Sequence, residues 1–539
     1  MKRNFISLTA LALCCALNGY AQYSGGSGTE ADPYLVATAE DLQAVTDNPT
    51  VYFKQTADID LEGVAFSPIA TFTGQYDGGG FTIDNLTMES GGNGLGLFAR
   101  VNTPGVIQNV VIRNASVSGG QWIGILCSTN GNWEIAGGTF KNCYIYDSAI
   151  DGSSSVAAFA GVAGGSFENC HAYNVTVDGT GDMIGGMSGD NEAGGHYYDC
   201  SFYGDVTGNT NVGPIVGFYN GDCKADVTIK NCVSYGTVTA NTKFGGGLVG
   251  SMNWNCNNIS IINSCSYANV TGVGVGGLVG ADARFDADRV FCTGKVNGKG
   301  DYYAGGLFAN VPFNVIKTIK NAYSSSEVTY SGTGIAGAIT GCFQGTGMTN
   351  TYYNSAAGMA GIGSGDGAGT ATAIDDMTKL ASYTFDDASL WQNIDGQTTP
   401  FFANQTVPTT VSECTTGKVK GTCTADLSNV YLCGSLSGSV LGQTLNIANG
   451  TWEVAFEEDA VMEDETLYII MIDKDKMPSM MTKAKVLAGG TDGIATVDNS
   501  NELAEPVATY NVAGQRNNGT QKGISIVKMS NGKTVKVLK

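Results

Sequence analysis

The sequence predicts an all-β protein whose main body is a right-handed parallel β-helix of about nine coils with roughly 30 residues each. Two observations support this prediction. A glycine box recurs down the chain, and each copy is followed, after a variable loop, by a second short motif. The chain also holds 77 glycines and only 14% charged residues, a composition that disfavours helices.

The two motifs keep their phase over seven intervals. The glycine boxes are Leu95–Phe98, Ile123–Leu126, Ile184–Met187, Val212–Ile215, Gly246–Leu248, Gly276–Leu278 and Gly305–Leu307. The second motif ends on Val110, Cys143, Cys170, Cys200, Cys232, Cys265, Cys292 and Ala322, at steps of 33, 27, 30, 32, 33, 27 and 30 residues. This period, without amphipathic helices between the motifs, excludes helical solenoids and is short for a propeller blade. Three short strands per period fit one coil of a β-helix.

The six cysteines of the second motif are expected to stack in successive coils, which raises the question of a metal or redox site. Val110 and Ala322 occupy the same position, and neither side chain can bind a metal. The sequence therefore favours an internal ladder of small apolar side chains. Pairing of neighbouring ladder cysteines stays open, because stacking alone does not guarantee disulfide geometry.

The chain begins with the pattern of a secretory signal peptide at residues 1–21. Lys2 and Arg3 precede the apolar run Phe5–Leu17, which is too short to span a bilayer. No later segment reaches transmembrane length, so we expect an exported protein without a membrane span. The net charge of −21 makes nucleic acid an unsuitable partner, because duplex binding needs a clustered positive surface.

Both ends of the rod need covers, because an open β-helix would expose strand edges and its core. Thr38 followed by Ala39–Val45 predicts a short N-capped helix over the first coil. Met377–Phe402 breaks the repeat and is rich in aromatic residues, which predicts a plug at the far end. The expected order is a capping region at 22–71, repeats at 72–360 and a closing segment at 361–403.

A change of composition near residue 406 predicts a small antiparallel β-sandwich at 406–487. A linker at 488–506 and a short C-terminal β unit at 507–539 follow it. The sandwich holds Cys414, Cys423 and Cys433, which allow one disulfide and one remaining thiol. Which two of the three pair stays open.

The repeats resemble the GLUG family of secreted bacterial proteins. The resemblance covers about residues 28–403 and rests on Gly-Gly-Leu-Val-Gly at 246–250 and 276–280, on the first-coil segment Phe72–Ile83, and on Trp391–Phe402. It implies a parallel β-helix in an adhesin-like surface protein or a stalk. Tyr510–Arg516 and Lys522–Val527 are similar to sorting domains of type IX secretion. This second resemblance implies recognition by that secretion machinery and export to the surface or medium of a Gram-negative bacterium.

The main alternative is an enzyme, since many β-helices are polysaccharide lyases or glycoside hydrolases, and glycoside hydrolysis needs a carboxylate pair. The best cluster is Asp282, Asp286 and Asp288 with Arg284 and Arg289, and the next is Asp190 with Glu192. We expect both clusters in loops, as solvated acids or as ligands of adventitious Ca²⁺. His171 and His196 are the two histidines, which leaves little material for zinc or serine–histidine chemistry.

The sequence therefore predicts no catalytic residue, no cofactor site and no metal site. The favoured function is a non-catalytic exported surface protein of adhesin-like type. It would bind a glycan or a host or matrix protein through exposed aromatic side chains, or act as a display stalk. The candidate aromatic residues are Trp122, Trp133, Tyr197, Tyr198, Tyr302 and Tyr303.

Overall fold

The computed structural model describes most of the chain from Tyr23 to Leu487 and several strands beyond it. The described ranges are 23–192, 194–220, 227–253, 256, 259–281, 284–312, 317–423, 429–433, 440–445, 447, 449–457, 460–473, 475–487, 497–498, 506–511, 516–517, 524–529 and 534–538. The expected signal peptide lies outside these residues. Within them, no helix is long and apolar enough to cross a membrane.

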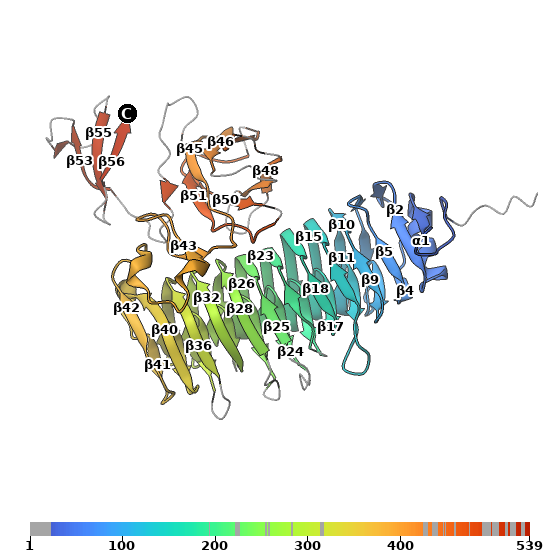
Figure 1. Cartoon of the computed structure of the whole chain (residues 1–539), viewed down its shortest axis with the longest axis horizontal. Helices are drawn as coiled ribbons and strands as arrows, with labels where there is room; N and C mark the ends of the chain where they lie inside the picture. The colour runs from blue at the N-terminus through green and yellow to red at the C-terminus, as the bar shows by residue number, and fades with distance from the viewer. Residues whose placement is uncertain are drawn as a thin grey trace, which may run out of the picture.

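The main body is the predicted parallel β-helix, which forms the long rod in Figure 1. One of its faces is a sheet of 11 parallel strands, one from each coil, that runs from β4 (Ile69–Phe72) to β41 (Ile362–Ser364). The other faces are parallel ladders that together contain 31 strands. A continuous apolar core fills the space between them.

Parallel pairing extends beyond the predicted repeat range at both ends. Near the N-terminus, β1 (Tyr34–Val36) pairs with β2 (Tyr52–Gln55), which pairs with β5 (Gln75–Asp77). Near the other end, β40 (Gly347–Asn354) pairs with β42 (Ala371–Ile374). Strand pairing uses backbone groups, so these irregular coils form without a glycine box. The predicted repeat range of 72–360 was too narrow because it was drawn from the boxes.

The predicted short helix is confirmed as α1 (Ala39–Ala44), at the N-terminal end of the rod (Figure 1). Thr38 and Asp41 form a reciprocal capping box. The Asp41 amide donates to Thr38 Oγ1 and the Thr38 amide donates to Asp41 Oδ2, each at 3.2 Å. Leu42 is fully buried and fixes the helix against the first coils.

One corner of the rod is a row of residues with left-handed backbone, most of them asparagine. Asn142, Asn169, Asn231 and Asn263 have φ between 50° and 55°. Asparagine is one of the few non-glycine residues that tolerate this conformation. The side chains also bond from coil to coil: Asn169 Nδ2 donates to Asn142 Oδ1 at 2.9 Å, and Asn263 Nδ2 donates to Asn231 Oδ1 at 2.6 Å. This corner sets the register of each coil.

The predicted internal cysteine ladder is confirmed for four of its six members. Cys143, Cys170, Cys200 and Cys232 each follow a left-handed corner residue and lie in register in the core. Their thiols are unpaired, and each lies within hydrogen-bonding distance of backbone carbonyls, as from Cys170 Sγ to the Phe140 carbonyl oxygen at 3.5 Å. They pack as small apolar side chains.

The predicted ladder position is wrong for Cys265 and Cys292, although Cys292 still packs in the main core, two residues beyond the ladder position. The residue that follows the corner in these coils is Ser264 or Val290, and these two pair with each other in the ladder. Cys265 instead lies opposite Val233, outside the main core. The cysteine spacing gave the wrong register because the left-handed corner, and not the cysteine, defines the phase.

The aromatic closing segment covers the side of the rod and does not plug its open end. It contains the short hairpin β43 (Trp391–Gln392) and β44 (Phe401–Phe402). The Phe402 ring lies 5.0 Å from the ring of Phe291, and the Trp391 ring lies 6.1 Å from it. Phe291 is opposite Cys265 in the ladder and faces away from the main core, so these contacts form on the outer surface.

Two antiparallel sheets follow, as predicted for the sandwich, and share a core that includes Trp452. The strands of the first sheet are β45 (Thr410–Cys414), β46 (Lys418–Thr422) and β49 (Thr451–Ala455). Those of the second are β47 (Asn429–Cys433), β48 (Val440–Leu445), β50 (Thr466–Ile472), β51 (Thr482–Lys485) and β52 (Val497–Asp498), the last of which lies in the expected linker. Cys414 is a buried free thiol, so it does not take part in the disulfide considered for this unit.

The predicted C-terminal β unit is a separate antiparallel sheet. Its strands are β53 (Pro506–Asn511), β54 (Arg516–Asn517), β55 (Ile524–Met529) and β56 (Thr534–Leu538). In Figure 1 it lies beside the two antiparallel sheets of the sandwich, on the side away from the N-terminal end of the rod.

Candidate functional site

Asp286, Asp288 and Arg289 of the larger predicted carboxylate cluster lie on strand β32 (Phe285–Cys292) and not in a loop. Asp286 accepts two hydrogen bonds, at 2.9 and 2.8 Å, from one threonine of the next coil. Asp288 accepts one from Arg289 at 2.6 Å and one from Asn321 Nδ2 at 2.8 Å. Asp282 lies outside the described residues, and Arg284 has a buried Nε without a hydrogen-bond partner in the described part of the chain. The bonds to Asp286 and Asp288 tie these carboxylates to the rod.

The second predicted pair is also placed by a strand. Asp190 lies on β21 (Ser188–Asn191), between Val162 and Phe218 of the neighbouring coils, and only 4% of its surface is exposed. Burial raises the pKa of its carboxyl to about 7, and the nearby charge of Glu192 adds to the shift. Asn220 Nδ2 donates to Asp190 Oδ2 at 3.2 Å, whereas Oδ1 has no hydrogen-bond partner within the described ranges.

His171 lies on the outer side of a strand of the rod. Its side chain lies outside the main core but is buried, with 8% exposed. Its Nδ1 lies 2.7 Å from Ser201 Oγ and its Nε2 lies 2.8 Å from Asn169 Oδ1. Burial lowers its pKa to about 4, so the ring is neutral at physiological pH. Ser201 is fully buried, so this pair has no route to an external substrate.

The predicted aromatic residues lie in four different environments. Tyr197 is fully buried, and its ring stacks on Phe167 at 4.8 Å, so the expectation that it is exposed is wrong. Trp133 is 72% exposed in a loop between two strands of the rod. Tyr198 is half-buried beside His196, with the ring centroids 5.6 Å apart. The remaining three candidates, Trp122, Tyr302 and Tyr303, lie along a second corner of the rod, different from the asparagine corner.

This corner is formed by the residues two positions before the box glycines at 124, 185, 213, 246, 276, 305 and 337, together with Ser155 in the same register. In chain order the row is Trp122, Ser155, Met183, Asn211, Phe244, Gly274, Tyr303 and Ile335. We call the five large side chains of this row the corner stripe: Trp122, Met183, Phe244, Tyr303 and Ile335. Strands in a sheet lie about 4.8 Å apart, so the seven steps of the row span about 34 Å.

The corner stripe stands on unusual backbone. Trp122, Met183 and Phe244 have φ of 60°, 64° and 62°, in the left-handed region. Bulky residues rarely adopt this conformation, and it costs about 1–2 kcal/mol relative to right-handed backbone. Asn211 and Gly274 hold the same position with φ of 61° and 67°, so the fold itself does not require a large side chain there. Trp122 nevertheless remains 45% exposed.

Gly274 leaves space for the ring of Phe244, a member of the stripe, and for the ring of Tyr302, which neighbours the stripe residue Tyr303. A Cβ atom at this position would lie 2.8 Å from the Tyr302 ring and 2.9 Å from the Phe244 ring. The centroids of those two rings are 5.4 Å apart, and Tyr302 lies 5.2 Å from Tyr303. The Lys243 ammonium lies 6.0 Å from the centroid of the Phe244 ring and adds a donor beside the aromatic surface.

Three members of the stripe were not among the predicted residues: Met183, Phe244 and Ile335. Their common signal is their place two residues before the first glycine of a box, the same place that Trp122 and Tyr303 hold. An alignment of the boxes by that position would have found all five. Residue type alone could not, because an aromatic or aliphatic residue next to glycine is equally suited to a core.

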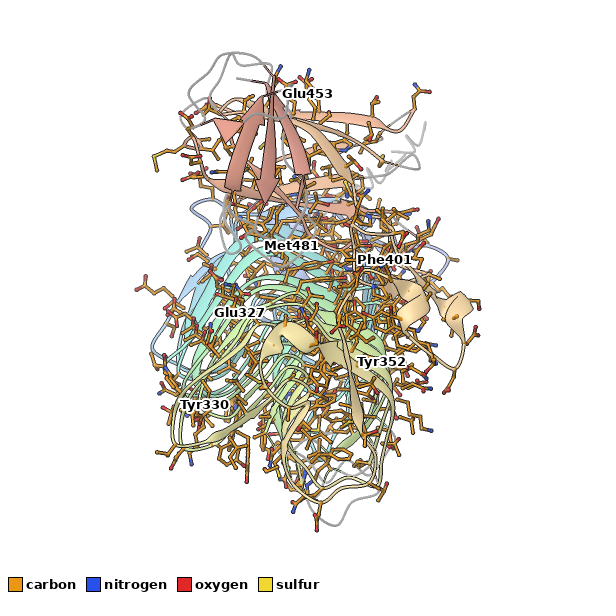
Figure 2. All side chains as sticks on the ribbon, turned by 90° about the vertical axis from the view of Figure 1, so that its left-hand side faces the viewer. Glu327, Tyr330, Tyr352, Phe401, Glu453 and Met481 are labelled. Carbon is orange, nitrogen blue, oxygen red and sulfur yellow. The ribbon has the colours of Figure 1, made fainter. Side chains whose placement is uncertain are left out.

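A second row of outward aromatic residues is covered by the chain itself. It comprises Tyr173, Tyr203, Tyr235 and Tyr267, with Phe291, Tyr323 and Tyr352 in the last coils. The Tyr235 hydroxyl donates to the Ser479 carbonyl at 2.6 Å, and Gln405 Nε2 donates to the Tyr267 hydroxyl at 3.0 Å. Figure 2 shows Phe401 and Met481 between the rod and the antiparallel sheets. The contacts of this row therefore attach the two antiparallel sheets of the sandwich to the side of the rod.

No family model matches the sequence. A stretch of 137 residues, 22% of this chain, is 37% identical to halomucin of Haloquadratum walsbyi and spans 1% of that protein. The crystal structure of a candidate immunoglobulin A1 protease from Bacteroides ovatus matches 71% of this chain and 95% of that chain, with 20% sequence identity and a TM-score of 0.40. Neither likeness assigns an activity to this chain.

Proposed function

We propose that this is an exported, non-catalytic surface protein of adhesin-like type, which binds an extended glycan along the corner stripe. The observation that carries the proposal is the left-handed backbone of Trp122, Met183 and Phe244. Strained residues of this kind concentrate at functional sites. Asn211 and Gly274 provide the same backbone without the bulk, so a ligand-binding role accounts for the large side chains.

The chemistry of the stripe suits a sugar polymer. Flat aromatic faces bind the apolar faces of sugar rings, while flanking polar groups bond to hydroxyls. Gln121 and Lys243 directly precede Trp122 and Phe244 and supply such groups. A straight row of about 34 Å, with one position per coil, favours a linear ligand over a small molecule.

Several features support export and surface location. Cys256 is disulfide-bonded, which fits an oxidising compartment. The partial match to halomucin, a surface protein, agrees with this location. We further propose that the chain belongs with the GLUG-repeat proteins, and that its C-terminal sheet is a sorting signal for type IX secretion in a Gram-negative bacterium.

Binding of the mature protein to a glycan array and to immobilised mucin tests the proposal. A triple variant, Trp122→Asn, Met183→Asn and Phe244→Asn, keeps residues suited to left-handed backbone and should lose at least tenfold in affinity. Trp133→Asn, which removes an exposed tryptophan outside the row, is the matched control and should bind normally. Unchanged binding by the triple variant would refute the stripe as the site, and silence of the native protein on both surfaces would refute glycan binding.

A display role is the second candidate, and the covered tyrosine row supports it. The contacts of Tyr235 with Ser479 and of Tyr267 with Gln405 hold the sandwich in a fixed position on the rod. If the sandwich carries the binding site, a chain without residues 406–487 should lose binding that the triple stripe variant retains. The deletion variant and the triple stripe variant therefore distinguish the display role from binding at the corner stripe.

A further inference from the structure

Asp190 is a buried carboxylate with few hydrogen-bond partners among the described residues. It is 4% exposed and points away from the core on the sheet of 11 strands. Asn220 donates to its Oδ2, and its Oδ1 has no hydrogen-bond partner among the described residues. Leaving an ionised oxygen buried without a donor or cation is unfavourable, so a positive partner from outside the described residues, such as a cation, is indicated.

Glu192 presents a second carboxylate on the same outer face. Side chains two apart on an extended strand share a face, and the Glu192 amide continues the ladder by donating to the Ala163 carbonyl at 2.9 Å. The Trp133 amide, which belongs to a loop two coils earlier, donates to Glu192 Oε2 at 3.3 Å. The nearness of Glu192 adds negative charge at Asp190, which a cation would offset.

Asn220 completes an oxygen-rich set from a third position. Its backbone amide donates to the Asn191 carbonyl at 2.9 Å, which places it beside Glu192 in the next coil. Its side-chain amide already contacts Asp190. A rotation of that amide by half a turn exchanges its nitrogen for its oxygen, so the same side chain can serve a carboxylate or a cation.

We propose that Asp190, Glu192 and Asn220 form a binding site for a divalent cation of the Ca²⁺ class. Ca²⁺ accepts six to eight oxygen ligands in flexible geometry, and two carboxylates, one amide oxygen and water meet that demand better than the strict octahedron of Mg²⁺. The described residues contain no group of three or more acidic, histidine or cysteine side chains placed to hold a metal. Two carboxylates give a weak site, with a dissociation constant on the order of 10⁻⁴–10⁻³ M, as in extracellular modules.

The site would join three parts of the rod that are distant in sequence. Asp190 and Glu192 belong to one coil, Asn220 to the next, and the Trp133 loop reaches them from two coils earlier. A bound cation would therefore hold the exposed Trp133 loop against the rod and stabilise this stretch of the solenoid.

Thermal unfolding of the full mature chain at pH 8 tests this inference, in EDTA and in about 10 mM CaCl₂ or MgCl₂. Ca²⁺ should raise the midpoint by about 2 °C, Mg²⁺ should raise it less, and Asp190→Asn should abolish the response. Asp286→Asn is the matched control, because Asp286 is a strand carboxylate with two donors already in place, and this variant should respond as the native chain does.

Terbium luminescence gives a second measurement that does not depend on stability. Tb³⁺ bound beside Glu192 should be sensitised by Trp133, and the emission should fall in Glu192→Gln and in Trp133→Phe. The inference is overturned if the native chain shows no midpoint shift with Ca²⁺ and no sensitised emission, or if Asp190→Asn and Glu192→Gln respond as the native chain does.

Discussion

Replacement of Gly274 by alanine measures how tightly the corner stripe is packed. At φ of +67° an alanine is strained by about 1–2 kcal/mol, and the loss of unfolded-chain freedom offsets about 0.4–1 kcal/mol of this. The new Cβ would also meet the rings of Tyr302 and Phe244 at 2.8 and 2.9 Å. Displacing two packed rings costs about 1–3 kcal/mol more. We expect Gly274→Ala to lower the free energy of unfolding by roughly 2–4 kcal/mol.

Gly63→Ala separates the two contributions. Gly63 has φ of +71°, but a Cβ built there meets nothing within 4 Å. This variant should lose only about 0.5–1 kcal/mol, which is the backbone cost alone. Urea unfolding of the mature chain, followed by far-UV circular dichroism, gives both values. Equal losses in Gly274→Ala and Gly63→Ala would show that the rings yield freely, and would refute the packed stripe.

Two further predictions concern Asp190 and the covered tyrosine row. In EDTA, Asp190 favours its protonated form in the folded state, because its pKa is about 7 against an ordinary 3.8. Its contribution to stability is therefore complete below about pH 4 and is lost as the pH rises through 7, by at most about 4 kcal/mol. Asp190→Asn should remove this dependence when urea midpoints at pH 5 and pH 8 are compared, and an unchanged pH dependence would contradict the assignment. Tyr235→Phe leaves the buried Ser479 carbonyl without its donor and should destabilise the docked sheets by about 1–3 kcal/mol. Faster proteolysis between residues 473 and 481, with the rod intact, is the expected result, and equal cleavage rates would refute it.

The coil period could be predicted because the local backbone conformation at each corner determines it. Asn142, Asn169 and Asn231 hold left-handed corners, and a small residue must follow each corner to enter the core. The same rule explains the failure at Cys265. Asn263 precedes Ser264, so the serine enters the ladder and the cysteine faces outward. Asparagine was the better marker, because it fixes the backbone and the cysteine only fills space.

Contacts between distant segments could not be predicted from local pattern. The aromatic closing segment suggested a plug, and nothing in Trp391 or Phe402 distinguishes an open core from an outer surface as the partner. The position of the closing segment depends on its contacts with Phe291, Tyr323 and Tyr352. These side chains point outward because successive side chains along a strand alternate between its two faces. Likewise, φ of 60° at Trp122 has no signal in the residue type, because tryptophan is rarely found there.

The two outer aromatic rows differ in a way that bears on function. The tyrosine row lies on extended backbone, and its members are buried beneath the closing segment and the antiparallel sheets that follow it, as the Tyr352–Phe385 ring contact and the bond from Tyr235 to Ser479 show. The corner stripe lies on left-handed backbone at three of its five members, and Trp122 and Ile335 remain 45% and 40% exposed. In the tyrosine row, burial of the large apolar side chains against the rest of the chain stabilises the fold. Within the described residues the corner stripe is not covered in this way, so an external partner is the simplest reason for large side chains on its strained backbone.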